Sequence, residues 1–178
     1  MLTYLEIWRS LTAAERTQAC AAFLRANDEM SRQVRPAALL ALATALHFRE
    51  KFLRTQPAAK QAEWLAARAG GPAFRTYHDG VLRSWLVQDH AAMIERFLDV
   101  QGIPHTGCML EGEPAAPDAG SLIKGIAAIR EQWGDRCSAL YLAFLLAEGA
   151  TEPWAALPAA LEASGLRPAE ALAAAPAA

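Results

Sequence analysis

The segment from Phe74 to Cys108 constrains the fold most strongly, because its apolar residues recur at helical spacing over nearly its whole length. The pattern predicts one long amphipathic helix that stops at Gly102-Ile103-Pro104, since glycine fits a left-handed position after a helix and proline cannot continue one. Such a helix must bury its apolar face against other elements. We therefore expect it at the centre of a helical domain.

The rest of the chain favours the same fold class. Ala, Leu, Glu, Arg and Gln are abundant, β-branched residues are sparse, and no alternating strand pattern extends beyond a few residues. We predict an all-α fold, a single-domain orthogonal or irregular bundle of about seven to eight helices over residues 1–166. Residues 167–178, rich in Ala and Pro, are expected to be a flexible tail.

Capping and helix-breaking residues place the other helices. Thr12 and Glu15 form a capping-box pattern that begins the second helix. A proline suited to a first helical position predicts a third helix over residues 36–54. Asp79-Gly80 is expected to interrupt the long helix, and Gly134-Asp135 predicts a tight connection within a helical hairpin.

The net charge of −2 is unevenly distributed, with +4 over residues 1–60 and −5 over residues 101–178. We interpret this as complementary charge on two halves that pack together. The alternative is a basic face on the N-terminal half that meets an acidic partner. A surplus of four charges is small for a phosphate-binding surface, so nucleic acid is not the expected partner.

Cysteine usage and hydropathy predict the compartment. Cys20, Cys108 and Cys137 are odd in number and far apart, which is typical of a reducing cytoplasm and not of a disulfide framework. The N-terminus carries Glu6 and lacks the apolar core of a secretory signal. The longest apolar run, near residues 139–147, is shorter than the roughly 20 residues that span a bilayer. We predict a cytoplasmic protein with no membrane partner, and the preference for Ala and for Arg over Lys suggests a bacterial genome rich in G and C.

Polar residues on the long helix form the first part of a candidate site. In helical projection Asp89 falls inside the apolar stripe, Arg83 and His90 share its edge, and Trp85 belongs to a second apolar stripe. Burying polar groups costs free energy, so their position needs a reason. They form either a buried polar link that fixes helix register or a site that binds a ligand or performs catalysis.

The turn after the long helix supplies the second part. His105 and Cys108 are three residues apart, and this spacing allows them to ligate zinc or to form a thiolate–imidazole pair. No second pair with metal-ligand spacing accompanies them, so we predict no metal site. The ligand-binding candidates are Arg83, Trp85, Asp89, His90, His105 and Cys108, and no catalytic residue is assigned.

The hypotheses on function depend on the motifs that the sequence lacks as well as on the residues that it contains. The sequence has no GxGxxG, Walker, HExxH, GxSxG, EF-hand or CxxCH motif, so no cofactor is predicted and an enzymatic role stays open. The first hypothesis is a non-enzymatic protein-interaction or assembly module, with self-association as a homodimer possible, because five tryptophans accompany many aliphatic residues. The alternatives are a ligand-binding protein or enzyme with a pocket at the six candidate residues, and nucleic-acid binding through Arg16, Arg25, Arg32, Arg35, Arg49, Lys51 and Arg54.

Overall fold

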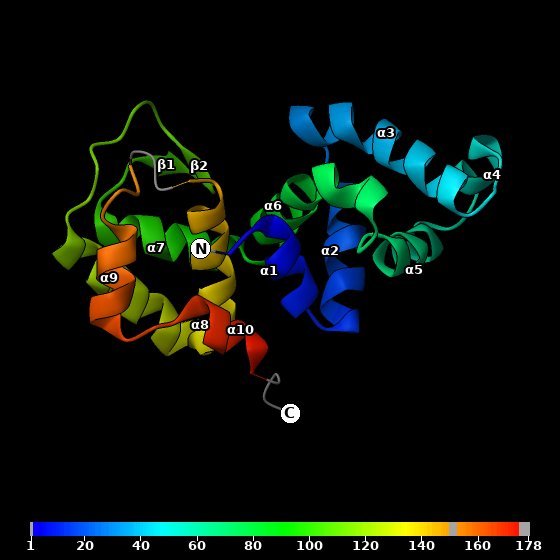
Figure 1. The fold of residues 1–178 in the computed structure, drawn as a ribbon. Coiled ribbons are helices and arrows are strands. Elements are labelled where there is room, and N and C mark those ends of the chain that lie inside the picture. The colour runs from blue at the N-terminus through cyan, green and yellow to red at the C-terminus, as the bar shows by residue number, and fades with distance from the viewer. Residues whose placement is uncertain (1, 150–152, 175–178) are drawn as a thin grey trace. The chain divides into compact units, whose positions relative to one another are not determined.

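The computed structural model describes residues 2–149 and 153–174. Within these residues the chain forms ten α-helices, one 3-10 helix and two very short strands, so the all-α prediction is confirmed (Figure 1). The helices outnumber the seven to eight predicted because two expected long helices are divided and a further helix forms in the expected tail. The chain's internal contacts define two compact units, an N-terminal unit of Tyr4–Asp89 and a C-terminal unit of His90–Ala178 with Met1–Thr3. The single domain expected over residues 1–166 stays a prediction.

The N-terminal unit is organised around α2, which packs against both α5 and α6. Its largest fully buried side chains include Trp8, Phe23 and Leu42, all at most 1% exposed. Thr12 caps α2 with the predicted capping box, since its hydroxyl accepts from the Glu15 amide and the Glu15 carboxylate accepts from the Thr12 amide. The elements of this unit are α1 (Tyr4–Ser10), α2 (Ala13–Arg25), α3 (Glu29–Ala45), α4 (Glu50–Arg54), α5 (Ala58–Arg68), η1 (Pro72–Tyr77) and α6 (His78–Asp89).

The prediction of one helix over residues 36–54 is wrong, because the helix begins earlier and the segment contains two helices. Asp28 accepts a hydrogen bond from the Ser31 amide at 2.9 Å and begins α3, so Pro36 lies inside the helix. The chain then leaves the helix at His47, whose φ of 55° is left-handed, and α4 follows as a separate short helix. A capping side chain therefore determines the start of α3, and a turn separates it from α4.

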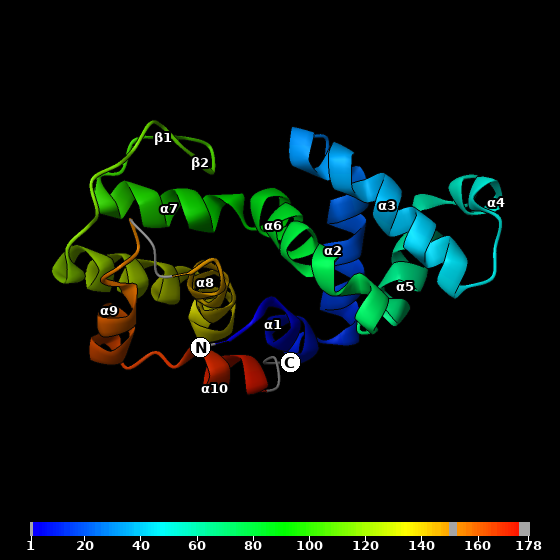
Figure 2. The same cartoon turned by 45° about the horizontal axis from the view of Figure 1, so that its top comes forward.

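The C-terminal unit is organised around α8, against which α7, α9 and α10 pack. The β1–β2 hairpin lies beside α7 in both ribbon views (Figure 1 and Figure 2). Phe97 is fully buried and contacts the rings of Tyr141 and Trp154. The elements of this unit are α7 (Ala91–Gln101), β1 (His105–Thr106), β2 (Met109–Leu110), α8 (Ala119–Ala147), α9 (Leu157–Ser164) and α10 (Pro168–Ala173).

A kink at Gly134 divides α8 into two helical segments. The backbone there has φ 75° and ψ 171°, a region that is essentially restricted to glycine. The predicted connection at Gly134-Asp135 is thus confirmed, although the two segments follow each other without a loop.

The long helix of the sequence pattern is interrupted later than expected. Residues 72–77 form η1, and α6 runs through Asp79-Gly80 without a break and ends at Asp89. His90 leaves the helical conformation and precedes α7. The predicted stop is confirmed, because Gly102 is left-handed and the Ile103 amide donates to the Leu98 carbonyl.

Part of the segment expected to be a flexible tail is helical. Residues 168–173 form α10, in which Leu172 is 2% exposed. The Arg136 side chain donates to the Leu172 carbonyl at 2.5 Å and to the Ala174 carbonyl at 2.9 Å, which fixes α10 on α8. Residues 175–178 of the expected tail lie outside the described residues.

Candidate functional site

The six predicted site residues divide between the two units. Arg83, Trp85 and Asp89 belong to α6 of the N-terminal unit, whereas His90, His105 and Cys108 belong to the C-terminal unit. Their convergence on one ligand therefore stays a prediction.

Asp89 is exposed, which corrects its predicted place inside the apolar stripe. Its carboxylate accepts from the Arg25 guanidinium of α2 at 3.4 Å, and the neighbouring Gln88 amide donates to the Ala22 carbonyl at 2.9 Å. The helical projection failed here because it extended the apolar stripe to the end of α6, whose last three residues are exposed. Asp89 thus links α6 to α2 at the surface, while Trp85 is buried at 3% exposure and Arg83 is half-buried.

His105 contacts two hydrogen-bond acceptors and not the thiol of Cys108. Its Nε2 lies 3.1 Å from the Asp99 carboxylate and its Nδ1 lies 2.6 Å from the Gly107 carbonyl. Cys108 donates instead to the Ala91 carbonyl, with 3.8 Å between Sγ and the oxygen. The thiolate–imidazole pair that the spacing allows is thus not formed, and the imidazole links the β1–β2 hairpin to α7.

The pKa of Cys108 is raised, first by burial and then by the negative charge of Glu95. Both effects disfavour the thiolate, which is the nucleophilic form of a cysteine. Among the described residues, no group of three or more His, Cys, Asp or Glu side chains is placed to hold a metal ion.

Stability of the hairpin is expected to depend on pH through His105. Its hydrogen bonds with Asp99 and then with Gly107 raise the pKa of His105, because both acceptors are satisfied only by the doubly protonated ring. The stabilisation is therefore fully present below the ordinary pKa of about 6.5 and is lost as the pH rises through the higher folded pKa. The Glu111 amide donates to the Pro104 carbonyl across the hairpin. Its exchange rate, divided by the intrinsic exchange rate at each pH, should rise over that range, and His105→Gln should abolish this rise. A ratio that does not change with pH in the unmodified protein would contradict this interpretation.

A contact that the sequence pattern did not reveal joins His90 to Cys137. The Sγ atom of Cys137 lies 3.3 Å from Nδ1 of His90, and both residues are half-buried. His90 precedes α7, and Cys137 follows the Gly134 kink of α8. A nucleophile and a base within hydrogen-bond reach form the first two members of a catalytic arrangement. No spacing rule could have found a pair so distant in the sequence.

A pocket of about 500 Å³ lies in the C-terminal unit between the end of α7 and the start of α8. It is lined by residues that include Gln101, Ile103, Glu111 and Asp118, and by none of the six predicted residues. The amide of Gln101 is buried and makes no hydrogen bond within the described residues. This amide packs so closely on Gly125 that a Cβ atom there would lie 2.1 Å from Nε2.

A third surface lies at the α4 end of the N-terminal unit, where aromatic side chains reach solvent. The rings of Phe48 and Phe52 are 5.1 Å apart, and Phe48 also contacts Trp64 at 5.3 Å. Phe48 and Phe52 are 37% and 47% exposed. We call Phe48, Phe52 and Trp64 the aromatic cluster.

The chain matches no protein-family model, no curated protein and no solved structure. Within the described residues, no helix combines the length and apolar character needed to cross a membrane.

Proposed function

We propose that this protein is a protein-interaction module whose binding surface is the aromatic cluster. The observation that supports the proposal is the exposure of two phenylalanine rings that already contact each other and Trp64. Aromatic side chains are enriched in protein interfaces and often supply most of the binding energy. Fully burying one such ring contributes about 1.5–3 kcal/mol, so covering the cluster favours association.

Charge around the cluster indicates the chemistry of the partner. Arg49 and Lys51 are exposed and form no ion pair with another described residue. The Lys60 ammonium lies 5.4 Å from the centre of the Trp64 ring. We call Arg49, Lys51 and Lys60 the basic rim.

The acidic residues nearby neutralise only part of this charge. Glu50 is paired with Arg54 at 2.6 Å, and Glu63 is the other acid of α4 and α5. The fitting partner is therefore a protein segment that presents apolar side chains flanked by carboxylates, because charge complementarity favours such an encounter. Such a partner agrees with the alternative interpretation of the charge distribution, in which a basic N-terminal half meets an acidic partner.

Two model peptides test this proposal directly. Both are amphipathic helices with the same leucine face, one with glutamates beside that face and the other with lysines. We expect the glutamate peptide to bind, with affinity that falls as salt is added, and the lysine peptide to bind far more weakly. Phe52→Ala should weaken binding about tenfold, since loss of part of a ring contact corresponds to roughly 1.4 kcal/mol. Fluorescence anisotropy measures these affinities.

A matched control uses Met109, which is 69% exposed in the C-terminal unit and lies outside the cluster. Met109→Ala removes an exposed apolar side chain and should leave peptide affinity unchanged. Equal binding of both peptides, or wild-type affinity in Phe52→Ala, would overturn the proposal. Sedimentation equilibrium tests whether the chain associates with itself. A dimer that Phe52→Ala dissociates would assign the aromatic cluster to binding a second copy of the chain.

A further inference from the structure

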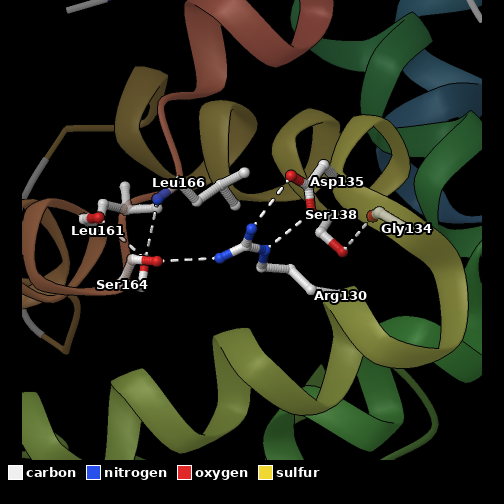
Figure 3. A network of polar contacts seen from close by, with 7 residues as sticks. All are labelled: Arg130, Gly134, Asp135, Ser138, Leu161, Ser164 and Leu166. Carbon is white, nitrogen blue, oxygen red and sulfur yellow. Dashed lines mark hydrogen bonds and ion pairs between the residues drawn. The ribbon is translucent and has the colours of Figure 1, made fainter.

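The kink in α8 creates a second helix start inside the C-terminal unit. Figure 3 shows how it is held: Arg130 donates to both carboxylate oxygens of Asp135, at 2.8 and 3.0 Å, and to the Ser164 carbonyl at 2.9 Å. On the other side of the turn, the Ser138 hydroxyl donates to the Gly134 carbonyl at 2.8 Å. Because these contacts fix the turn, the residues that follow it have defined positions.

Cys137 lies in the first turn after this restart. The start of a helix carries a partial positive charge from its backbone amides, which stabilises an anion such as a thiolate. Asp135 is the acid of the same turn, and its hydrogen bonds with Arg130 lower its pKa and compensate its charge.

His90 supplies a base for the same thiol. Sγ and Nδ1 lie 3.3 Å apart, within hydrogen-bond reach, and in the tautomer that carries its proton on Nε2 the unprotonated Nδ1 accepts from the Cys137 thiol. Transfer of that proton gives a thiolate beside an imidazolium, an arrangement that activates cysteine nucleophiles. Both residues are half-buried, so part of the pair remains accessible to a small reagent.

In the other two cysteines, Cys20 and Cys108, the pKa of the thiol is raised. Cys20 is fully buried, and burial raises its pKa to about 12. Cys108 is half-buried like Cys137, but its thiol faces the Ala91 carbonyl and its pKa is raised. Cys108 is therefore an internal control that is also half-buried, because its burial and the charge of Glu95 disfavour its thiolate.

We propose that Cys137 is a redox modification site at which hydrogen peroxide oxidises the thiol, with His90 as the base. The Cys137 proton moves to Nδ1, and the thiolate attacks one peroxide oxygen. The O–O bond breaks as the S–O bond forms, so the sulfur is oxidised to a sulfenic acid and the peroxide is reduced. The departing hydroxide takes the proton from the imidazolium and leaves as water.

Alkylation of the native full-length protein by iodoacetamide, followed by peptide mass mapping, tests the reactivity. We expect Cys137 to react at least about tenfold faster than Cys108, and Cys20 to react only after unfolding. His90→Gln should lower the Cys137 rate about tenfold towards that of Cys108, because the substitution removes the base. His105→Gln changes a histidine of the same unit that does not contact Cys137, and it should leave the Cys137 rate unchanged.

Trapping with dimedone after peroxide treatment tests the oxidation itself. The sulfenic acid adduct is expected at Cys137 in the unmodified protein and is expected to be absent in Cys137→Ser. Equal alkylation of Cys137 and Cys108 in the unmodified protein would overturn the proposal even if His90→Gln fails to fold. Dimedone labelling of Cys108 in preference to Cys137 would overturn it as well.

Discussion

Phe97→Ala is expected to destabilise the C-terminal unit by about 3–5 kcal/mol, the range for removing a fully buried phenylalanine. Phe97 is 0% exposed, and its ring lies 5.4 Å from that of Tyr141 and 5.7 Å from that of Trp154. Its edge also lies against Gly125, where a Cβ atom would be only 3.1 Å away. The substitution therefore leaves a cavity between α7 and α8 and removes two aromatic contacts.

Urea unfolding followed by amide exchange in α7 and α8 measures this effect. Phe52→Ala is a matched control, because the same substitution at a 47% exposed position is expected to cost less than about 1 kcal/mol. Similar costs at the two positions would contradict the assignment of Phe97 to the core.

Trp8→Ala is expected to lower the free energy of unfolding of the N-terminal unit by about 3–5 kcal/mol, as much as Phe97→Ala lowers that of the C-terminal unit. Trp8 is 1% exposed and stacks on His78 with ring centres 5.5 Å apart. His78 is itself buried and its Nε2 donates to the Ala69 carbonyl at 2.7 Å. Removing the indole thus leaves a cavity and exposes an imidazole that must stay neutral.

The pH dependence of stability provides a second measure of the effect of Trp8→Ala. Burial lowers the pKa of His78, so its contribution to stability is fully present above the ordinary pKa of about 6.5 and is lost as the pH falls below it. In Trp8→Ala water reaches the ring, and the pKa of His78 should return towards that value. An NMR titration of His78 measures the change, and Trp8→Phe keeps an aromatic ring in case the alanine variant does not fold. An unaltered titration in both variants would refute the stacking argument.

Local signals predicted much of the helical structure. Thr12 with Glu15, Gly102 and Gly134 each mark a helix boundary that the structure confirms. Such boundaries depend on a few neighbouring residues, so the sequence suffices to find them. The errors arise where two local signals compete: Pro36 suits a first helical position, while Asp28 caps the helix eight residues earlier.

The candidate sites were harder to predict, because they depend on contacts between distant residues. Helical periodicity located the polar residues of α6, but it did not reveal that the last three residues of this helix, including Asp89, are exposed. The contact of His90 with Cys137 joins two helices whose packing no spacing rule specifies. The exposure of Phe48 and Phe52 likewise follows from the turn at His47, which the apolar pattern did not indicate.

The kink at Gly134 also limits the dimensions of the C-terminal unit. As a straight helix, the 29 residues of α8 would extend about 44 Å, at 1.5 Å per residue. A compact domain of this unit's size has a radius of gyration of about 12 Å, so a straight rod would project its apolar ends into water. By changing direction at one glycine, α8 keeps Leu122 and Ile126 of its first segment and Leu142 of its second inside the same small core.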